Sequence, residues 1–409
     1  MSELEIEKIG AQGDGVADGP VFVPLTLPGE RVAARVQGDR AELVEVLRAS
    51  PERIAPVSPH YGECGGCSLQ HWAHGPYLAW KAEQLRLALG RERIETDILP
   101  PFAAAPGTRR RLALHARKGK GGAEIGFKAR RSWRLVAVET CPIADPRLVA
   151  SFPALRRLAE PFLEHPKSAP TLHVTWTATG LDVDVTGVER RSGGLSADAR
   201  MRAAEAASAA DMARVTMGGE IIYQARQPMV RLGPAAVALP AGAFLQAVPQ
   251  AEQAMAEFVV EAVQGAGRLA DLYCGVGTFT FRLAEVAPVY AADFTAPAIA
   301  ALKAAMGTAP GLKAITAEAR DLVRRPVLSS ELGKIDAVVL DPPRAGAAEQ
   351  VGEIARSKTP RVAYVSCNPA TFARDARTLA DAGFTLERVL PVDQFLWSPH
   401  IELVGVFTR

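Results

Sequence analysis

Over residues 241–409, the alternation of short apolar strands with helices limits the fold more than any other feature. Strand-like runs such as RLADLY, VYAAD, KIDAVVLDPP and RVAYVSC are each followed by a helical stretch. This order favours a largely parallel sheet with helices on both faces. Only a short connection separates the last two strands, which predicts an antiparallel pair. We therefore predict an α/β fold, a doubly wound Rossmann-like domain, for residues 241–409.

Two further domains are predicted before it, because a chain of 409 residues is long enough for two or three. Residues 1–52 alternate β-rich runs with glycine turns, which favours a small five-stranded barrel of the oligonucleotide-binding type. Residues 53–240 begin with a proline-rich connector and a helix over residues 77–90, for which packing on the C-terminal domain is an alternative to packing within its own domain. They continue as a mixed β domain interrupted by one Ala-rich helix around residues 197–212.

Positive charge is concentrated in one segment of the central domain, although the net charge of the chain is only +2. Crowded charge of one sign favours a polyanion such as nucleic acid, although a solvated surface is the alternative. Phe127 and Trp133 lie among these charges and are suited to stacking on bases. The segment contains ten basic residues: Arg109, Arg110, Arg111, Arg117, Lys118, Lys120, Lys128, Arg130, Arg131 and Arg134.

A ligand pocket is predicted where the first strand of the C-terminal domain turns into a helix. The turn DLYCGVGTF has glycines at 275 and 277 but lacks the third glycine of a dinucleotide-binding turn, so a pyrophosphate ligand is disfavoured. Asp293 ends the next strand, where a carboxylate is placed to accept hydrogen bonds from ribose hydroxyls. The motif DPPR at 341–344 follows a further strand of the same sheet.

The motifs DLYCGVGTF, LDPPR and SCNPATFARD, in this order, resemble the S-adenosylmethionine-dependent RNA 5-methyluridine methyltransferases of the RlmD/TrmA-like family. GAFLQ at 242–246 and HIELV near the C-terminus fit the same pattern. GDGVADGPVFVPLTLPGERV resembles the N-terminal TRAM domain of that family. The resemblance implies S-adenosylmethionine as cofactor. It further implies contacts to the cofactor from Gln246, Tyr273, Asp293 and Asp341.

Cys367 is the predicted catalytic nucleophile. It ends the strand RVAYVSC and precedes Asn368 and Pro369, whereas Cys274 in the glycine turn is interpreted as a packing residue. A thiolate that adds to carbon 6 of uracil makes carbon 5 electron-rich enough to accept a methyl group. A base must then remove the proton from carbon 5, and the resemblance assigns this role to Glu402. The alternative for Cys367 is a small core residue at a strand end.

Three cysteines form a candidate metal site. Cys64, Cys67 and Cys141 resemble ligands of the family's 4Fe-4S cluster, but Ser58 stands where a fourth cysteine is expected. Serine is a poor iron ligand, and such clusters are normally held by four thiolates. Two alternatives remain, namely zinc held by the three cysteines with His71, or a site that has lost its metal. We favour the cluster.

The predicted function is methyl transfer to carbon 5 of a uridine in RNA. Ribosomal RNA is favoured over transfer RNA because a TRAM-like barrel and a cysteine cluster are both present. A non-catalytic RNA-binding protein with a relict methyltransferase domain is the alternative from another class. We expect a cytoplasmic protein, because there is no signal sequence, long apolar run or disulfide-like cysteine pattern, and we expect it to be a monomer.

Overall fold

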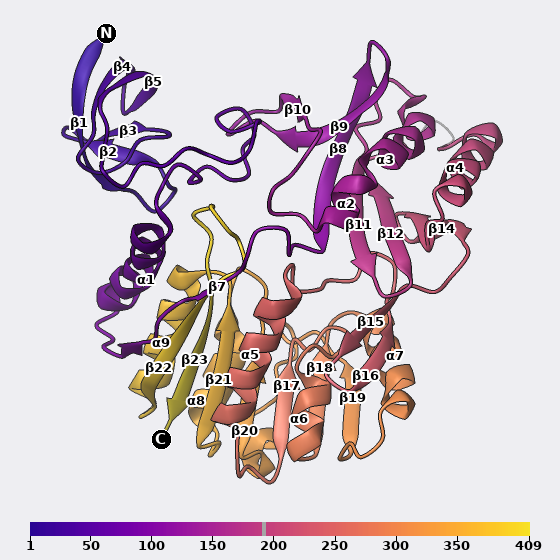
Figure 1. Ribbon diagram of the computed structural model, residues 1–409. Helices are drawn as coiled ribbons and strands as arrows, with labels where there is room; N and C mark the ends of the chain where they lie inside the picture. Colours follow the sequence, from indigo (N-terminus) through magenta and orange to yellow (C-terminus); the bar gives the residue numbers. More distant parts are fainter. Residues whose placement is uncertain (190–193) are drawn as a thin grey trace.

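The computed structural model describes residues 1–189 and 194–409. Its strands group into an N-terminal barrel, a central mixed sheet, a two-stranded hairpin and a large C-terminal sheet (Figure 1). None of the described helices is both long and apolar enough to cross a bilayer.

The N-terminal barrel is closed, with the strand order β1-β2-β3-β5-β4. Its interior is filled by alternate side chains of the strands, among them Ile6, Val23 and Val32. The predicted small barrel is therefore confirmed. The strands are β1 (Ser2–Ile9), β2 (Gly15–Ala17), β3 (Val21–Val23), β4 (Arg31–Gln37) and β5 (Arg40–Arg48).

The central sheet has the order β10-β9-β8-β11-β12-β13-β14, and α3 and α4 pack on it. α4 agrees with the predicted Ala-rich helix, but α2 and α3 were not predicted because they are short. The elements are β8 (Arg111–Gly119), β9 (Gly122–Lys128), β10 (Leu135–Ala137), α2 (Pro146–Ala150), α3 (Phe152–Ala159), β11 (Thr171–Thr177), β12 (Gly180–Thr186), α4 (Ala197–Ala209), β13 (Arg214–Met217) and β14 (Glu220–Gln224). The hairpin of β15 (Met229–Leu232) and β16 (Ala235–Ala238) connects this sheet to the C-terminal domain.

The C-terminal sheet is doubly wound, as predicted. From β19 to β21 its strands run parallel in the order β19-β18-β17-β20-β21, and β23 pairs antiparallel with β21 and β22. The strands are β17 (Leu269–Leu272), β18 (Val289–Asp293), β19 (Ile315–Ala319), β20 (Ala337–Leu340), β21 (Arg361–Ser366), β22 (Thr385–Asp393) and β23 (Glu402–Thr408).

Helices cover both faces of this sheet (Figure 1). One core contains side chains of α5 and α6, and the core on the other face contains side chains of α8 and α9. α7 packs against the β15–β16 hairpin. The helices are α5 (Pro249–Ala262), α6 (Thr280–Val286), α7 (Ala296–Ala305), α8 (Ala348–Arg356) and α9 (Pro369–Asp381).

A segment far away in the sequence completes this domain. α1 (His74–Arg91) places Leu85 and Leu89 in the same core as α8 and α9. The short strands β6 (Asp97–Ile98) and β7 (Phe102–Ala103) then pair in parallel with β22. Residues 74–103 thus pack with the C-terminal sheet. The packing of the helix was expected from the sequence, whereas the pairing of β6 and β7 with β22 was not.

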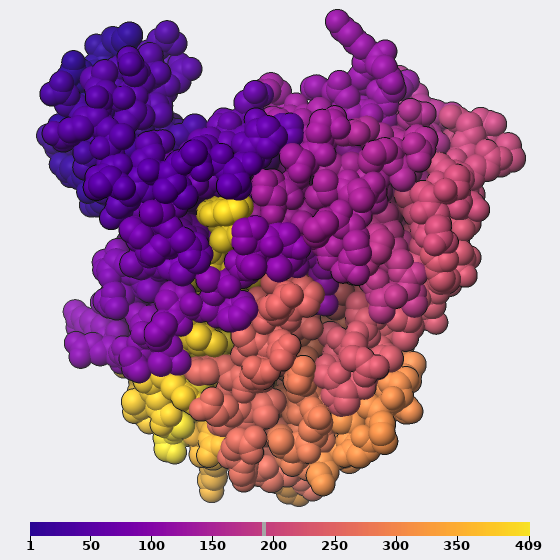
Figure 2. All heavy atoms as spheres, viewed as in Figure 1, coloured from indigo at the N-terminus to yellow at the C-terminus, as the bar shows by residue number. Residues whose placement is uncertain are grey.

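A buried ion pair fastens α1 to the loop between β22 and β23. Lys81 Nζ lies 2.5 Å from Asp393 Oδ1 and donates to the backbone carbonyls of Phe395 and His400. Beyond this pair, the backbone N–H of Leu69 donates to the carbonyl of Trp397. This C-terminal loop (yellow) consequently lies between the N-terminal segment and the central sheet (Figures 1 and 2).

Replacing Lys81 with Met is expected to destabilise the C-terminal domain. The substitution leaves the Asp393 carboxylate buried without its cation, and breaking a buried pair in this way costs about 3–5 kcal/mol. Calorimetric unfolding should show this loss. The double variant Lys81→Met/Asp393→Asn should recover part of it. An unchanged unfolding transition in the single variant would contradict the assigned role of the pair.

Candidate active site

A cavity of about 1040 Å³ opens at the carboxyl ends of β17, β18, β20 and β21. This edge is where doubly wound sheets bind their ligands. The structure brings all six residues predicted for catalysis and cofactor binding to the wall of this one cavity: Gln246, Tyr273, Asp293, Asp341, Cys367 and Glu402.

The glycine turn shapes one side of the cavity. Tyr273 and Gly277 have positive φ angles of 63° and 99°, and a Cβ at Gly277 would lie 2.6 Å from the ring of Phe281. Asp293 holds the turn, because its Oδ2 accepts the backbone N–H of Gly275 at 3.0 Å. Cys274 is only 3% exposed and packs in the core, as predicted.

Cys367 is positioned by the end of β21 and the start of α9. The side chain of Asn368 caps α9 by accepting the backbone N–H of Ala370, and its amide donates to the carbonyl of Arg344. These contacts join the SCNP turn to the DPPR motif. The thiol of Cys367 is half-buried and faces the same cavity as Glu402.

Two buried glutamines connect the carboxylates of the cavity. Gln394 Nε2 donates to Glu402 Oε2 at 2.8 Å and to Gln246 Oε1 at 2.7 Å. Gln246 Nε2 lies 3.3 Å from Asp341 Oδ2. The glutamine chain therefore fixes both Glu402 and Asp341. Sequence reasoning missed Gln394, whose position next to Asp393 and upstream of HIE carried no recognisable signal.

Burial dominates the titration of these groups. It raises the pKa of Glu402 to about 7, and the hydrogen bond from Gln394 opposes this shift. Burial, followed by the charge of Glu402, raises the pKa of Cys367 to about 11, whereas the charge of Arg344 lowers it. The same two causes raise the pKa of Asp341 well above its usual value. The resting cysteine is therefore a thiol near neutral pH.

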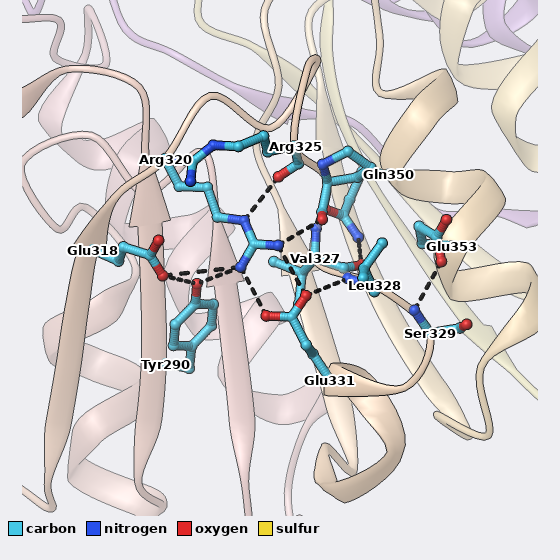
Figure 3. Close-up of polar contacts among 11 residues, drawn as sticks. Tyr290, Glu318, Arg320, Arg325, Val327, Leu328, Ser329, Glu331, Gln350 and Glu353 are labelled. Atoms are coloured by element: carbon cyan, nitrogen blue, oxygen red, sulfur yellow. Dashed lines mark hydrogen bonds and ion pairs between the residues drawn. The ribbon is translucent and has the colours of Figure 1, made fainter.

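A loop after β19 forms another side of the cavity and contributes Asp321 and Val323. Arg320 anchors this loop by donating to the carbonyls of Arg325 and Pro326 and by pairing with Glu331 at 2.8 Å (Figure 3). Asp321 was not predicted, although it lies just beyond the end of β19 and Asp293 lies at the end of β18. Exposed Phe244 and Phe294 also line the cavity and were missed.

The three predicted metal-site cysteines line one small cavity of about 20 Å³ together with Ser58. Burial raises the pKa of all three thiols, that of Cys67 to about 12. Within residues 1–189 and 194–409, no group of three ligating side chains is close enough to hold a metal ion. His71 is absent from the lining of this cavity and is bonded to Tyr61, so the proposed zinc set of three cysteines with His71 is not assembled.

Half of the ten basic residues in the segment 109–134 are paired with carboxylates of other elements or strands. Arg110 pairs with Glu252 of α5 at 2.6 Å, and Arg130 and Arg131 both pair with buried Asp14 of the barrel. Arg117 and Arg134 pair with Glu124 and Glu63. Arg110, Arg130 and Arg131 therefore join domains instead of contributing to one free surface.

Comparison with known proteins identifies the class. The tRNA (uracil-5-)-methyltransferase family model matches residues 236–409. An uncharacterized RNA methyltransferase of Caulobacter vibrioides is 72% identical, with 100% of both chains covered. The 23S rRNA (uracil(1939)-C(5))-methyltransferase RlmD of Alkalilimnicola ehrlichii is 33% identical over 100% of this chain and 96% of its own.

A solved structure shares the whole fold. The Pyrococcus abyssi tRNA (uracil-54, C5)-methyltransferase, in complex with S-adenosyl-L-homocysteine, superposes with a TM-score of 0.75 at 24% identity over 99% of both chains. The chain therefore belongs to the family of S-adenosylmethionine-dependent RNA (uracil-5-)-methyltransferases. This confirms the resemblance seen in the sequence motifs and disfavours the alternative of a non-catalytic RNA-binding protein.

Replacing Glu402 with Gln is expected to make Cys367 more reactive toward iodoacetamide. The charge of Glu402 raises the pKa of Cys367, so its removal lowers that pKa and increases the thiolate fraction at mildly alkaline pH. Because one pKa unit corresponds to about tenfold in thiolate, we expect a several-fold faster alkylation. Peptide mapping at several pH values would measure it. Glu257→Gln, an exposed substitution on α5, should leave the rate unchanged; equal rates in both variants would contradict the coupling.

Proposed function

We propose that this enzyme methylates carbon 5 of one uridine in ribosomal RNA through a covalent bond between Cys367 and the base. The observation that carries the proposal is that Cys367 and Glu402 line one cavity together with the predicted cofactor residues. The full-length similarity to a 23S rRNA methyltransferase supports the choice of ribosomal RNA over transfer RNA.

The cofactor end of the cavity suits S-adenosylmethionine, which supplies a methyl group on a sulfonium when bound. The carboxylate of Asp293 accepts the backbone N–H of Gly275 in the turn and that of Thr295 two residues on, which orients it to accept hydrogen bonds from ribose hydroxyls. We propose that Gln246, Tyr273 and Asp341 complete this part of the site. The exposed ring of Phe294, which follows Asp293, is suited to an aromatic base.

Cys367 must lose its proton to act, because its thiol predominates near neutral pH. Addition of the sulfur to carbon 6 forms the C6–S bond and moves the ring electrons to carbon 5, which then takes the methyl group. The nearby charge of Arg344 favours the thiolate and the enolate oxygen alike.

Glu402 is proposed to complete the reaction. With a pKa of about 7, it is ionised to a useful extent at neutral pH and is still basic enough to take a proton from carbon. It removes the proton from carbon 5, the C5–C6 double bond re-forms and the C6–S bond breaks. The thiolate of Cys367 is thereby regenerated, and Gln394 keeps the carboxylate aimed during this step.

The covalent step predicts a trapped adduct with RNA that contains 5-fluorouridine. Fluorine cannot leave carbon 5 as a cation, so the wild-type enzyme with S-adenosylmethionine should give a slower band on a denaturing gel. Cys367→Ala should abolish the band. A folded Cys274→Ala variant should retain it. Glu402→Gln should accumulate an adduct with ordinary RNA as well. If the wild-type enzyme binds the cofactor but gives no adduct, Cys367 is not the nucleophile.

Use of 5-fluorouridine-substituted ribosomal and transfer RNA in parallel decides the substrate. We expect the adduct with 23S ribosomal RNA and none with transfer RNA. An adduct confined to transfer RNA would leave the chemistry intact and overturn the proposed target.

We further propose that Cys64, Cys67 and Cys141 provide three thiolates to a labile iron–sulfur cluster. The support is that the three thiols line one cavity. They are not close enough in the described structure to hold a metal, so binding requires their side chains to move together. Their raised pKa values oppose metal binding, because the metal must displace the thiol protons. Ser58 lines the same cavity where a fourth cysteine is expected. Because serine is a poor iron ligand, we expect the cluster to be lost easily.

Anaerobic incubation with iron and sulfide should therefore give visible absorption and bound iron that a chelator removes readily. Cys64→Ser/Cys67→Ser should bind no iron, and Ser58→Cys should bind it more firmly. Stoichiometric zinc or an absence of bound iron after this treatment would contradict the cluster.

A further inference from the structure

A second large cavity lies in the central domain, away from the catalytic one. It measures about 800 Å³, within the range of about 300–1,000 Å³ typical of ligand pockets. It lies between the strands β8 and β9, the turn before β10, and the segment 163–171 that leads into β11. We call it the cationic cleft, after the lining residues Arg117, Lys118, Lys128, Trp133, Arg134 and His165.

The charge of the cationic cleft is uncompensated where its lysines lie. Arg117 and Arg134 have carboxylate partners outside the cleft, Glu124 at 2.7 Å and Glu63 at 3.4 Å. Lys118 and Lys128 have no ion pair among the described residues, and the described lining contains no carboxylate. Such a surface attracts a ligand with spaced negative charges, and phosphodiesters provide them.

Trp133 gives the cleft an aromatic surface. Its side chain is 87% exposed, although an indole gains several kcal/mol of free energy from burial. The ammonium of Lys128 lies 3.7 Å from the centroid of its ring. An exposed aromatic ring beside one lysine, in a cleft that a second lysine also lines, suits single-stranded nucleic acid, whose bases can stack and whose phosphates can pair.

The course of β8 sets the distance of the cleft from the catalytic cavity. Arg111 at the start of the strand donates to the carbonyl of Leu245, next to Gln246 of the catalytic cavity. From Arg111 to Lys118 the strand advances seven residues, about 23 Å at the usual rise. One nucleotide cannot occupy both places, but one RNA strand can reach from one to the other.

We propose that the cationic cleft binds a single-stranded part of the substrate RNA, several nucleotides from the target uridine. One base stacks on Trp133, and the neighbouring phosphates pair with Lys118 and Lys128. That the bound RNA is the substrate rests on the proposed function.

Photo-cross-linking of the full-length protein to an oligouridylate that contains 4-thiouridine tests the position. We expect adducts on the peptide that contains Trp133 and a roughly tenfold lower yield in Lys118→Ala/Lys128→Ala. Lys303→Ala/Lys334→Ala removes the same charge from exposed positions of the C-terminal domain and should leave the yield unchanged. Adducts confined to the C-terminal domain, or equal yields in the two double variants, would overturn the proposal.

Binding affinity tests the two kinds of contact separately. In Lys118→Ala/Lys128→Ala, the loss of two phosphate contacts should reduce the slope of log K against log salt by about 1.4. Trp133→Ala should weaken binding by about tenfold, whereas Trp133→Phe should retain most of it, because any aromatic ring can stack. Equal weakening by Phe and Ala, or by neither, would overturn the stacking role.

These measurements need neither methyl transfer nor Cys367. If the cationic cleft does not bind RNA, its variants will bind oligouridylate as the wild type does and will still methylate RNA. A failure of the proposed function would appear as RNA binding without methylation.

Discussion

The buried pair of Lys81 and Asp393 is the interaction on which the active site most depends. It fixes α1, an element of the N-terminal half, against the loop that leaves β22. That loop carries Gln394, Phe395 and His400 and leads directly into Glu402. Because a lysine in the interior loses its hydration, it remains charged only while the carboxylate and the two carbonyls surround it. The loop therefore takes one conformation, and with it the candidate base takes one position.

Within the catalytic cavity, burial has opposite consequences for the candidate base, Glu402, and for the candidate nucleophile, Cys367. It raises the pKa of Glu402 into the neutral range, which suits a group that must take up and release a proton. It also raises the pKa of Cys367, which makes the sulfur less reactive until substrate and Arg344 stabilise the negative charge. If Cys367 acts as proposed, the raised pKa of its thiol protects it from unwanted electrophiles. Gln394 and Gln246 lie between the two carboxylates. Gln394 donates to Glu402 and to Gln246, and Gln246 donates to Asp341.

The basic segment of the central domain serves two purposes that the sequence does not separate. Arg110 forms a nearly buried pair with Glu252 and so joins the central sheet to α5. Arg130 and Arg131 hold the turn before β10 on the barrel through Asp14, which presents Trp133 beside Lys128 at the cationic cleft. The arginines that join the domains thereby set the position of the residues proposed to bind RNA.

The sequence by itself determined the chemistry-bearing residues and the order of the elements. The alternation of strands and helices predicted the doubly wound sheet, and the resemblance of the motifs to a known methyltransferase family implied the roles of residues that the structure brings to one cavity. The order of the elements could be predicted because local periodicity and turn residues are encoded within a few positions of the chain. Only the tertiary structure revealed the pairing of β6 and β7 with β22, the contact of Gln394 with Glu402, and the arginines that join domains. Residues 81 and 393 illustrate the physical reason: their bond joins positions 312 residues apart, and no local pattern in the chain records a partner at that distance.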